Sequence, residues 1–466
     1  MAAEFDQCLP KTVGIISLGC SKNRVNCEQM MFLLRNAGYH VTGETDGADF
    51  VLLNTCGFIE SAKAEAVETI LELAAAKESG RAGKLIVAGC LPQRHKEDIL
   101  KELPEIDAVA GTGSFDDIVD VIKSLEKEAG GLSSSSFRGF FGDIDAPVSE
   151  TDRIISTSPV WAYLKIAEGC DNRCAYCCIP DIRGKFRSRP IENIVNEAKK
   201  LVKAGVRELI IVAQDVTRYG TDLYGERKLS VLLKALNDIK KLKWIRLHYL
   251  YPDEFDDEII DVIAKSDKIL KYLDIPIQHI NDGILKKMNR RGTGNDIKAL
   301  LKNLREKIPG VVIRTSLITG LPGEGEKEFK ELCAFLSESK IERVGVFAYS
   351  PEKGTEAARM ERPSKETAEK RAEHLLELQS QIMHKWNESR IGSVETVLLE
   401  GIGFSGQTES YLSRSYAESP EIDGYIHIKV TQDTAEPSLC TFTDVRITGI
   451  ENGELAGEPT LTQRTS

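Results

Sequence analysis

The sequence lacks any apolar run long enough to cross a membrane. Of its 466 residues, 41% are hydrophobic and 29% are charged, and no apolar stretch approaches the roughly 20 residues that a membrane helix needs. The opening segment, Met1–Lys11, has neither a basic region nor an apolar core, so we expect no secretion signal. We therefore expect a cytoplasmic protein without a membrane partner.

An excess of positive charge is also missing. The formal net charge is −11 at pH 7, whereas a protein that holds nucleic acid through a general basic surface needs many Lys and Arg contacts to phosphate. The charge therefore argues against such a surface. It permits a basic protein as partner, or RNA bound through a local patch.

The expected cytosolic setting does not favour disulfide bonds, yet the chain has 11 cysteines. In a reducing compartment, cysteines at regular places are more often metal ligands or catalytic groups. The chain is also too long for a single core, so we expect two to four domains.

Residues 10–128 are predicted to form an open parallel α/β domain. Helix-like stretches separate short apolar runs at 12–19, 50–55, 84–89 and 106–111. This alternation is typical of a parallel sheet with helices on both faces. Residues 129–155 are predicted to be a linker, because their first part is rich in glycine and serine.

Residues 156–390 repeat the alternation and are predicted to form a partial (β/α)6 barrel. The candidate strands are 162–168, 208–213, 244–250, 272–277, 311–318 and 343–348. Six such units suggest an incomplete barrel rather than a closed eightfold one. Residues 391–455 contain short β-rich runs and are predicted to form a small antiparallel β-barrel.

Three cysteines lie close together directly after the first predicted strand of this barrel. Cys170, Cys174 and Cys177 are spaced by four and three residues. Three thiolates on one loop can hold three irons of a 4Fe–4S cube and leave the fourth iron open to a small molecule. The alternative is a structural zinc site, which needs a fourth ligand and favours paired C-x2-C units. We interpret the adjacent Cys178 as a small buried residue.

The C-x3-C-x2-C loop resembles that of the radical S-adenosylmethionine (SAM) superfamily. The resemblance implies that the open iron binds SAM, that one electron splits it to a 5′-deoxyadenosyl radical, and that Tyr176 lies near the adenine. Other matches at later strand ends are implied to flank SAM: Gln214, Asp215, Gln278, Gly320 and Pro322. The alternative is that each of these loops only serves its own turn.

Three further cysteines follow apolar strands of the first domain. Cys20, Cys56 and Cys90 each come just past a predicted strand, and such ends share one edge of a parallel sheet. The pattern alone leaves open three buried cysteines. However, Ser17–Asn23, with the stretches around Cys56 and Cys90, resembles the first domain of the methylthiotransferases, which implies an auxiliary 4Fe–4S cluster with one free iron.

The resemblance covers nearly the whole chain, because the last β-rich part is similar to a TRAM domain. It implies two 4Fe–4S clusters, SAM as both radical source and methyl donor, and a reducing electron donor. The remaining cysteines match no motif and are predicted to be structural, with Cys27 near the site: Cys8, Cys27, Cys333 and Cys440.

Two branches of this family are the serious candidates. Stretches such as Ile182–Pro190, Ala213–Gly220 and Arg414–Gly424 resemble the RimO branch, which implies an aspartate β-carbon of small-subunit ribosomal protein uS12, free or in the ribosomal subunit, as the substrate. The alternative is a tRNA adenosine methylthiotransferase.

The charge of residues 391–466, here called the acidic tail, favours the first branch. The tail has 12 acidic and 4 basic residues, a net charge of −8. A tail that grips tRNA should be basic, whereas an acidic one suits a basic ribosomal protein. A merely solvated acidic barrel remains an alternative.

The implied chemistry needs no side-chain base, because a C–H bond beside a carboxylate is removed more readily as a hydrogen atom. The cofactors perform the difficult steps, and the protein orients them and excludes water. We also hypothesise that the basic loop Lys185–Arg189 steers an acidic or RNA-adjacent substrate.

Overall fold

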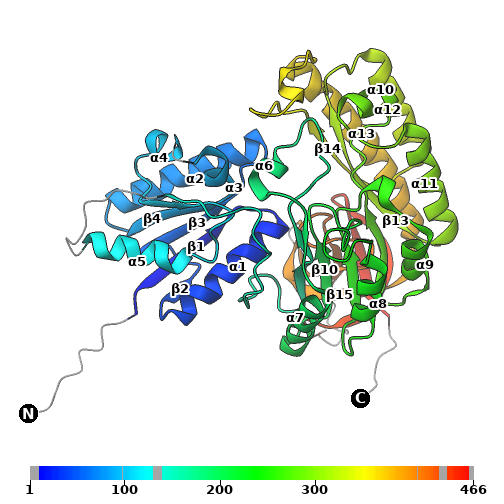
Figure 1. Ribbon diagram of the computed structural model, residues 1–466. Helices are drawn as coiled ribbons and strands as arrows, with labels where there is room; N and C mark the ends of the chain where they lie inside the picture. Colours follow the sequence, from blue (N-terminus) through cyan, green and yellow to red (C-terminus); the bar gives the residue numbers. More distant parts are fainter. Residues whose placement is uncertain (1–9, 97, 130–138, 407, 430–437, 461–466) are drawn as a thin grey trace, which may run out of the picture.

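The computed structural model describes residues 10–96, 98–129, 139–406, 408–429 and 438–460. An amino-terminal α/β unit lies beside a larger α/β unit, and a small β-barrel packs against the larger one (Figure 1). None of the described helices is both long and apolar enough to cross a membrane.

The amino-terminal unit is a parallel sheet in the order β2-β1-β3-β4-β5-β6. Its strands are β1 (Thr12–Ser17), β2 (His40–Thr42), β3 (Phe50–Thr55), β4 (Lys84–Gly89), β5 (Ala108–Ala110) and β6 (Gly139–Phe140). Its helices are α1 (Ser21–Asn36), α2 (Glu60–Glu78), α3 (Cys90–His95), α4 (Asp98–Glu102) and α5 (Ile118–Ala129). One apolar core joins the sheet to α1 and α5, and another joins its opposite face to α2 and α4, as the strand–helix alternation predicts.

The central unit is an open parallel sheet in the order β7-β10-β11-β12-β13-β14. Its strands are β7 (Trp161–Lys165), β10 (Glu208–Val212), β11 (Trp244–Leu247), β12 (Ile269–Asp274), β13 (Val312–Thr319) and β14 (Arg343–Ala348). Its long helices are α7 (Ile191–Ala204), α8 (Leu229–Asn237), α9 (Asp257–Lys265), α11 (Gly294–Lys307), α12 (Glu326–Ser339) and α13 (Lys365–Arg390), and the short α10 (Asp282–Lys287) precedes α11. This is the partial barrel predicted from the sequence.

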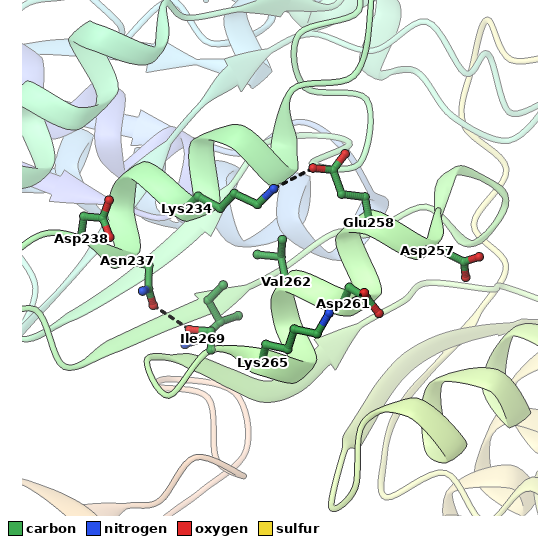
Figure 2. Close-up of a pocket in the computed structure, with 10 residues that line it drawn as sticks. Lys234, Asn237, Asp238, Asp257, Glu258, Asp261, Val262, Lys265 and Ile269 are labelled. Carbon is green, nitrogen blue, oxygen red and sulfur yellow. Dashed lines mark hydrogen bonds and ion pairs between the residues drawn. The ribbon is translucent and has the colours of Figure 1, made fainter.

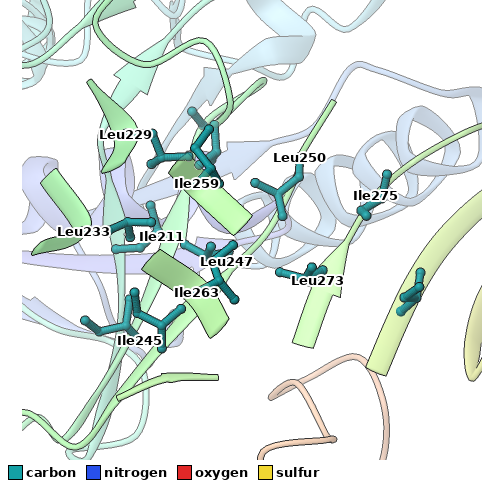
Figure 3. Close-up of a cluster of buried hydrophobic side chains, with 14 of the residues drawn as sticks. Ile211, Leu229, Leu233, Ile245, Leu247, Leu250, Ile259, Ile263, Leu273 and Ile275 are labelled. Carbon is teal, nitrogen blue, oxygen red and sulfur yellow. The ribbon is translucent and has the colours of Figure 1, made fainter. Parts of the chain in front are cut away.

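The outer face of this sheet carries the main core of the protein. Aliphatic side chains of β10, β11 and β12 pack against leucines of α8 and isoleucines of α9 (Figure 3). Ile211, Leu247 and Leu273 are fully buried. Burying one such side chain contributes about 1.5–3 kcal/mol, so this layer holds the strand ends in place.

The carboxyl-terminal strands form a closed barrel in the order β15-β16-β17-β19-β18. They are β15 (Val394–Ser405), β16 (Thr408–Arg414), β17 (Ile426–Lys429), β18 (Phe442–Glu451) and β19 (Glu454–Pro459). The prediction of a small barrel is confirmed, but the pairing is not wholly antiparallel, since β17 and β19 run parallel.

The small barrel packs against the end of the central unit where its strands begin. Trp244 and Val312, at the start of β11 and β13, share an apolar cluster with Leu398. The loop after β16 also contacts β11: the Tyr416 carbonyl accepts from Arg246 (2.7 Å), and Ser419 shares a hydrogen bond with His248 (2.9 Å), just past the carboxyl end of that strand. In barrels of this kind the strand starts serve stability and the strand ends serve chemistry.

Candidate functional site

The loop between β7 and α7 carries Cys170, Cys174 and Cys177, called here the loop cysteines. A short antiparallel ribbon of β8 (Ala167–Glu168) and β9 (Arg187–Ser188) closes its base. Gly169 has φ +81°, and a Cβ there would lie 1.9 Å from the Lys185 carbonyl oxygen. Only glycine therefore fits where the strand turns into the loop.

The surroundings of the loop cysteines raise the pKa values of two of their thiols. Burial raises the pKa of Cys170 to about 11 and raises that of Cys177 well above its ordinary value. Both shifts are increased by the negative charge of neighbouring cysteines, which places the three side chains within electrostatic reach of one another. These two thiols favour the protonated form, so a metal bound here would have to displace their protons.

Two residues that the sequence did not single out lie beside Cys174. The Tyr251 hydroxyl is 3.7 Å from its sulfur, and an Arg290 guanidinium nitrogen is 3.8 Å away. Arg290 stacks over the Tyr251 ring at 4.0 Å. Arg290 therefore places a buried positive charge beside one of the loop cysteines.

Tyr176 lies against the loop that follows β13. It packs into an apolar cluster with Leu321, between the predicted SAM residues Gly320 and Pro322. Gly320 has φ +74°, and a Cβ there would lie 2.3 Å from the Cβ of Ala368 in α13. The structure thus brings Tyr176 and the Gly320–Pro322 turn together, and their role in SAM binding stays a prediction.

Gln214 and Asp215 lie just past β10 and contact the cysteine loop from the side. Gln214 donates to Glu168 (2.6 Å). Asp215 accepts from Asn172 of the loop (2.8 Å) and from the Thr217 hydroxyl (2.5 Å). Both of its oxygens are therefore engaged by protein, so Asp215 orients the loop as it stands.

Gln278 follows β12 with φ +70°. Its backbone bridges to β13, where its N–H donates to Ser316 (2.9 Å) and its carbonyl accepts from Ile318 (2.8 Å). The predicted SAM residues and the loop cysteines therefore all lie at the strand ends of one parallel sheet, where ligands bind in such folds.

Cys20, Cys56 and Cys90, called here the auxiliary cysteines, follow β1, β3 and β4, which are neighbours in the sheet. Cys20 caps α1 and Cys90 is the first residue of α3. A Cβ at Gly57 would lie 2.8 Å from the Cys90 backbone, so the loops after β3 and β4 touch.

Buried amide side chains join these loops. Asn23 donates to the Thr55 carbonyl (2.9 Å), and Asn54 donates to the Asn23 carbonyl (3.1 Å) and to Ser17 (3.1 Å). The Thr55 hydroxyl donates to the Ala88 carbonyl (2.7 Å). Because buried polar groups are costly when unpaired, this network fixes the relative positions of the auxiliary cysteines.

The auxiliary cysteines lie in unlike electrostatic surroundings. Burial raises the pKa of Cys56 to about 11, with a further contribution from the negative charge of Cys90. Cys20 is open to solvent but crowded by its neighbours; desolvation opposes ionisation, and the positive charges of Lys22 and Arg183 outweigh it and lower the pKa. The mutual charge effects show that the three thiols are close enough to act on one another.

The two cysteine sets meet at the interface between the units. Cys90 packs directly with Cys178 and Ile182, which follow the cysteine loop. Arg183, at the end of α6 (Ile179–Arg183), reaches across and donates to the Cys90 sulfur (3.2 Å). Strands from one domain and a loop from another therefore build a single region around six thiols.

The donor set fits iron–sulfur chemistry at both places. All described cysteines are free, and within the described ranges no three Cys, His, Asp or Glu side chains surround one point closely enough for a single metal ion. In a 4Fe–4S cube each cysteine binds a different iron, so its sulfur ligands need not converge on one atom.

The remaining cysteines take no part in these sets. Cys27 is buried in α1 and burial raises its pKa to about 12, although it hydrogen-bonds Ser17 near the auxiliary cysteines. Cys178 is buried, as interpreted from the sequence. Cys333 and Cys440 lie elsewhere on partly or fully exposed positions, and Cys8 lies outside the described residues.

The hypothesis of a steering basic loop is wrong for most of Lys185–Arg189. Arg189 is buried and pairs with Glu150 (2.5 Å) and Glu197 (2.7 Å). Arg187 is half-buried and donates to carbonyl oxygens of its own loop. Charged residues in a loop are usually solvated, but ion pairs to Glu150 and Glu197 turn Arg189 inward, and hydrogen bonds to carbonyl oxygens do the same for Arg187.

One hollow on the described residues lies away from this chemistry. It is a groove of about 570 Å³ between α8 and α9, lined by charged side chains such as Lys234 and Glu258, which pair at 2.8 Å (Figure 2). No cysteine lines it, and we assign it no role.

Comparisons with known proteins agree with this architecture. Models of the Radical SAM superfamily, of "Uncharacterized protein family UPF0004" and of the TRAM domain match residues 164–336, 12–111 and 391–459. A protein of Acetivibrio thermocellus, named ribosomal protein uS12 methylthiotransferase RimO, is 45% identical over 97% of this chain and 98% of its own length. One of the same name from Caldanaerobacter subterraneus is 46% identical over 93% of this chain and 97% of its own length.

Among solved structures, the radical SAM methyltransferase TsrM of Kitasatospora setae, with cobalamin and a 4Fe–4S cluster bound, has a similar fold. The TM-score is 0.55 at 13% identity, over 75% of this chain and 77% of TsrM. At this identity the likeness supports the fold alone.

Proposed function

Because this chain belongs to the family of ribosomal protein uS12 methylthiotransferases, we propose that it transfers a methylthio group to the β-carbon of an aspartate of uS12. The proposal extends to the cofactors: one 4Fe–4S cluster on the loop cysteines, a second on the auxiliary cysteines, and SAM. It also extends to a reducing electron donor and, since the described cysteines are free thiols, to the cytoplasm.

The observation that carries this proposal is the packing of Cys90 against Cys178. A radical at a substrate carbon must react with the sulfur group before it reacts with solvent. The two cysteine sets must therefore lie close together in a place that excludes water. When bound, SAM and the clusters would supply hydrogen-atom abstraction, sulfur and methyl group. The contacts between α3, which begins at Cys90, and α6, which follows Cys178, support such a common place.

The chain's own residues contribute position and exclusion of water. The Gly169 turn and the Asp215–Asn172 hydrogen bond hold the cysteine loop. Tyr176 offers an apolar ring beside the Gly320–Pro322 turn, where we propose that SAM binds, with Gln214 and Gln278 at the neighbouring strand ends. Preorganised groups of this kind lower the barrier by fixing the reactants.

The acidic tail supports a protein substrate over tRNA. Its described basic side chains offer little to a phosphate backbone, because Arg414 is fully buried in ion pairs with Glu208 and Glu400, and Lys429 pairs with Glu451. Arg446 is exposed, and it donates to the Gly392 carbonyl. Tight binding of RNA usually takes several phosphate contacts.

The test is an anaerobic reaction of reconstituted protein with SAM and a reductant on three substrates: uS12 alone, small ribosomal subunits, and tRNA. The expected product is one added methylthio group on a uS12 aspartate, located by mass spectrometry of peptides. The control protein is the Cys20→Ala/Cys56→Ala/Cys90→Ala variant, which should cleave SAM without transferring sulfur. Modification of tRNA instead of uS12 would refute the proposal.

A further inference from the structure

The auxiliary cysteines are surrounded by more buried positive charge than the protein balances. Arg183 is 3% exposed, and its guanidinium donates to Asn23 (2.9 Å), to Asn26 (2.9 Å) and to the Cys90 sulfur (3.2 Å). Two of these partners are neutral amides. Two of these three hydrogen bonds therefore go to groups that cannot neutralise the charge of the guanidinium.

One carboxylate serves two cations here. Glu168 lies 3.3 Å from Arg183 and 2.8 Å from Lys165, which is 2% exposed. This is the only ion pair of Arg183 among the described residues, and it leaves one positive charge in excess. Buried charges are otherwise paired in proteins.

A second buried cation lies beside Cys20. Lys22 is 8% exposed and has no ion pair within the part of the chain that the structure describes. Its ammonium instead lies 3.3 Å from the centroid of the Tyr249 ring, a contact that attracts a cation without cancelling its charge. Lys22 and Arg183 thus flank the auxiliary cysteines from opposite units.

Arg153 provides a contrast within the same interface. It is also a buried arginine that joins the amino-terminal unit to the barrel, but it pairs with both Glu28 and Glu197. Its charge is fully compensated, and it has no cysteine among its partners. Interface formation alone therefore does not require an uncompensated cation.

We propose that Arg183 is a positioning residue that raises the reduction potential of the auxiliary cluster, through its hydrogen bond to the Cys90 sulfur and its uncompensated charge. The inference rests on the proposed function, since it needs a cluster on the auxiliary cysteines. An added electron makes a cluster more negative, so a nearby cation and an N–H···S bond stabilise the reduced state. Because Arg183 directly follows the cysteine loop, it also ties the position of that loop to the auxiliary cysteines.

The test uses the full chain with Cys170, Cys174 and Cys177 replaced by Ala, so that only the auxiliary cluster remains. Its potential is measured by redox titration followed by electron paramagnetic resonance. Arg183→Gln should lower the ratio of reduced to oxidised cluster about tenfold at a fixed potential, which is about 59 mV for one electron. Arg183→Lys, which keeps the charge, should recover part of this shift.

A charge change of opposite sign separates tuning from damage. Glu168→Gln removes the one neutralising carboxylate and should raise the potential, whereas general damage to the site would shift the potentials of both variants in the same direction. Arg153→Gln should leave the potential unchanged. If Arg183→Gln does not retain iron, the reduction potential of Glu168→Gln alone tests whether the uncompensated charge raises the potential of the cluster.

Unchanged potentials in Arg183→Gln or Glu168→Gln, with iron retained, would overturn the inference and leave the proposed function intact. Absence of iron in the parent variant that lacks the loop cysteines would remove the second cluster from the proposed function, and the inference with it.

Discussion

The two cysteine sets differ in how the chain assembles them. The loop cysteines lie between Cys170 and Cys177 on one loop, whereas the auxiliary cysteines come from three strands, between Cys20 and Cys90. The first set needs one correctly shaped loop. The second needs three strands in register, a buried amide network and contacts from the barrel. A local site is thus specified by spacing, and an assembled site by the packing of two domains.

Contacts between the two domains affect mainly the site that is assembled from the auxiliary cysteines. Glu352, which follows β14, is 2% exposed and accepts from Lys63 (3.0 Å) and Arg94 (2.7 Å) of the amino-terminal unit. Arg94 also donates to the Gly57 carbonyl, next to Cys56. We therefore expect damage at this interface to affect the auxiliary cysteines before the loop cysteines.

The largest effect on activity is expected when one of the loop cysteines is replaced. Cys174→Ala should abolish methylthio transfer and reduce bound iron by about four atoms, because the remaining two thiols leave the cluster short of a ligand. Cys56→Ala should lose a similar amount of iron but still cleave SAM. Assays of SAM cleavage and iron content distinguish the two. Methylthio transfer by Cys174→Ala would contradict the assignment of the loop cysteines.

The next effect is expected at the domain interface. Glu352→Gln should lower the free energy of unfolding by about 2–4 kcal/mol, because two cations lose their charged partner. The variant should also lose iron from the auxiliary cysteines more readily than from the loop cysteines. Denaturant unfolding measures the change in free energy, and the iron content measures the loss from the cysteines. Glu258→Gln, which breaks the exposed pair with Lys234, is the control and should cost less than about 1 kcal/mol.

Acid should weaken the same contact. Burial opposes ionisation of Glu352, but hydrogen bonds from Lys63 and Arg94 hold its pKa below the ordinary value of 4.5. Its contribution to stability is therefore present above 4.5 and is lost as the pH falls through the folded-state pKa. In cluster-free protein, the stability difference between wild type and Glu352→Gln should shrink below pH 4.5. A difference that stays constant would contradict this.

A smaller effect is expected inside the amide network. Asn54→Ala removes two buried donors and should cost about 1–3 kcal/mol, with loss of iron from the auxiliary cysteines. The comparison is Asn172→Ala on the cysteine loop, where the side chain is partly exposed and the three thiols remain on one loop. Asn172→Ala should keep its iron. Equal iron loss in both variants would remove the distinction between a local and an assembled site.

The smallest effect is expected at Lys185, the exposed member of the basic loop. Lys185→Glu should change the free energy of unfolding by less than about 0.5 kcal/mol and leave turnover unchanged on both uS12 and ribosomal subunits. A clear fall in turnover on either substrate would restore the steering hypothesis for this one residue.

The main units of the fold could be predicted because their strands are apolar and separated by amphipathic helices. Strands that lack this pattern cannot be recognised from the sequence. β16 is mostly polar, and β19 contains Gly457 and Pro459, so neither stands out from a loop. β6 lies in the range predicted to be a linker; it pairs with β5 next to Gly113 and Gly142, whose close approach leaves no room for a side chain.

The cysteines of both sets could be named from the sequence, but not the groups that surround them. Arg189 belongs to the basic loop Lys185–Arg189 and Arg183 lies just before it, but both are buried in ion pairs with Glu168, Glu150 and Glu197 from other segments. Arg290 and Tyr251 reach Cys174 from loops that are distant in the sequence. Tertiary contacts of this kind leave no local periodicity in the sequence.

The central claim is that six cysteines in two separately specified sets hold two clusters. Its most direct test is the iron and sulfide content after anaerobic reconstitution, for wild type and for Cys20→Ala/Cys56→Ala/Cys90→Ala. We expect about eight irons in the wild type and about four in the variant. About four irons in both proteins would contradict the claim and leave a single-cluster radical SAM enzyme.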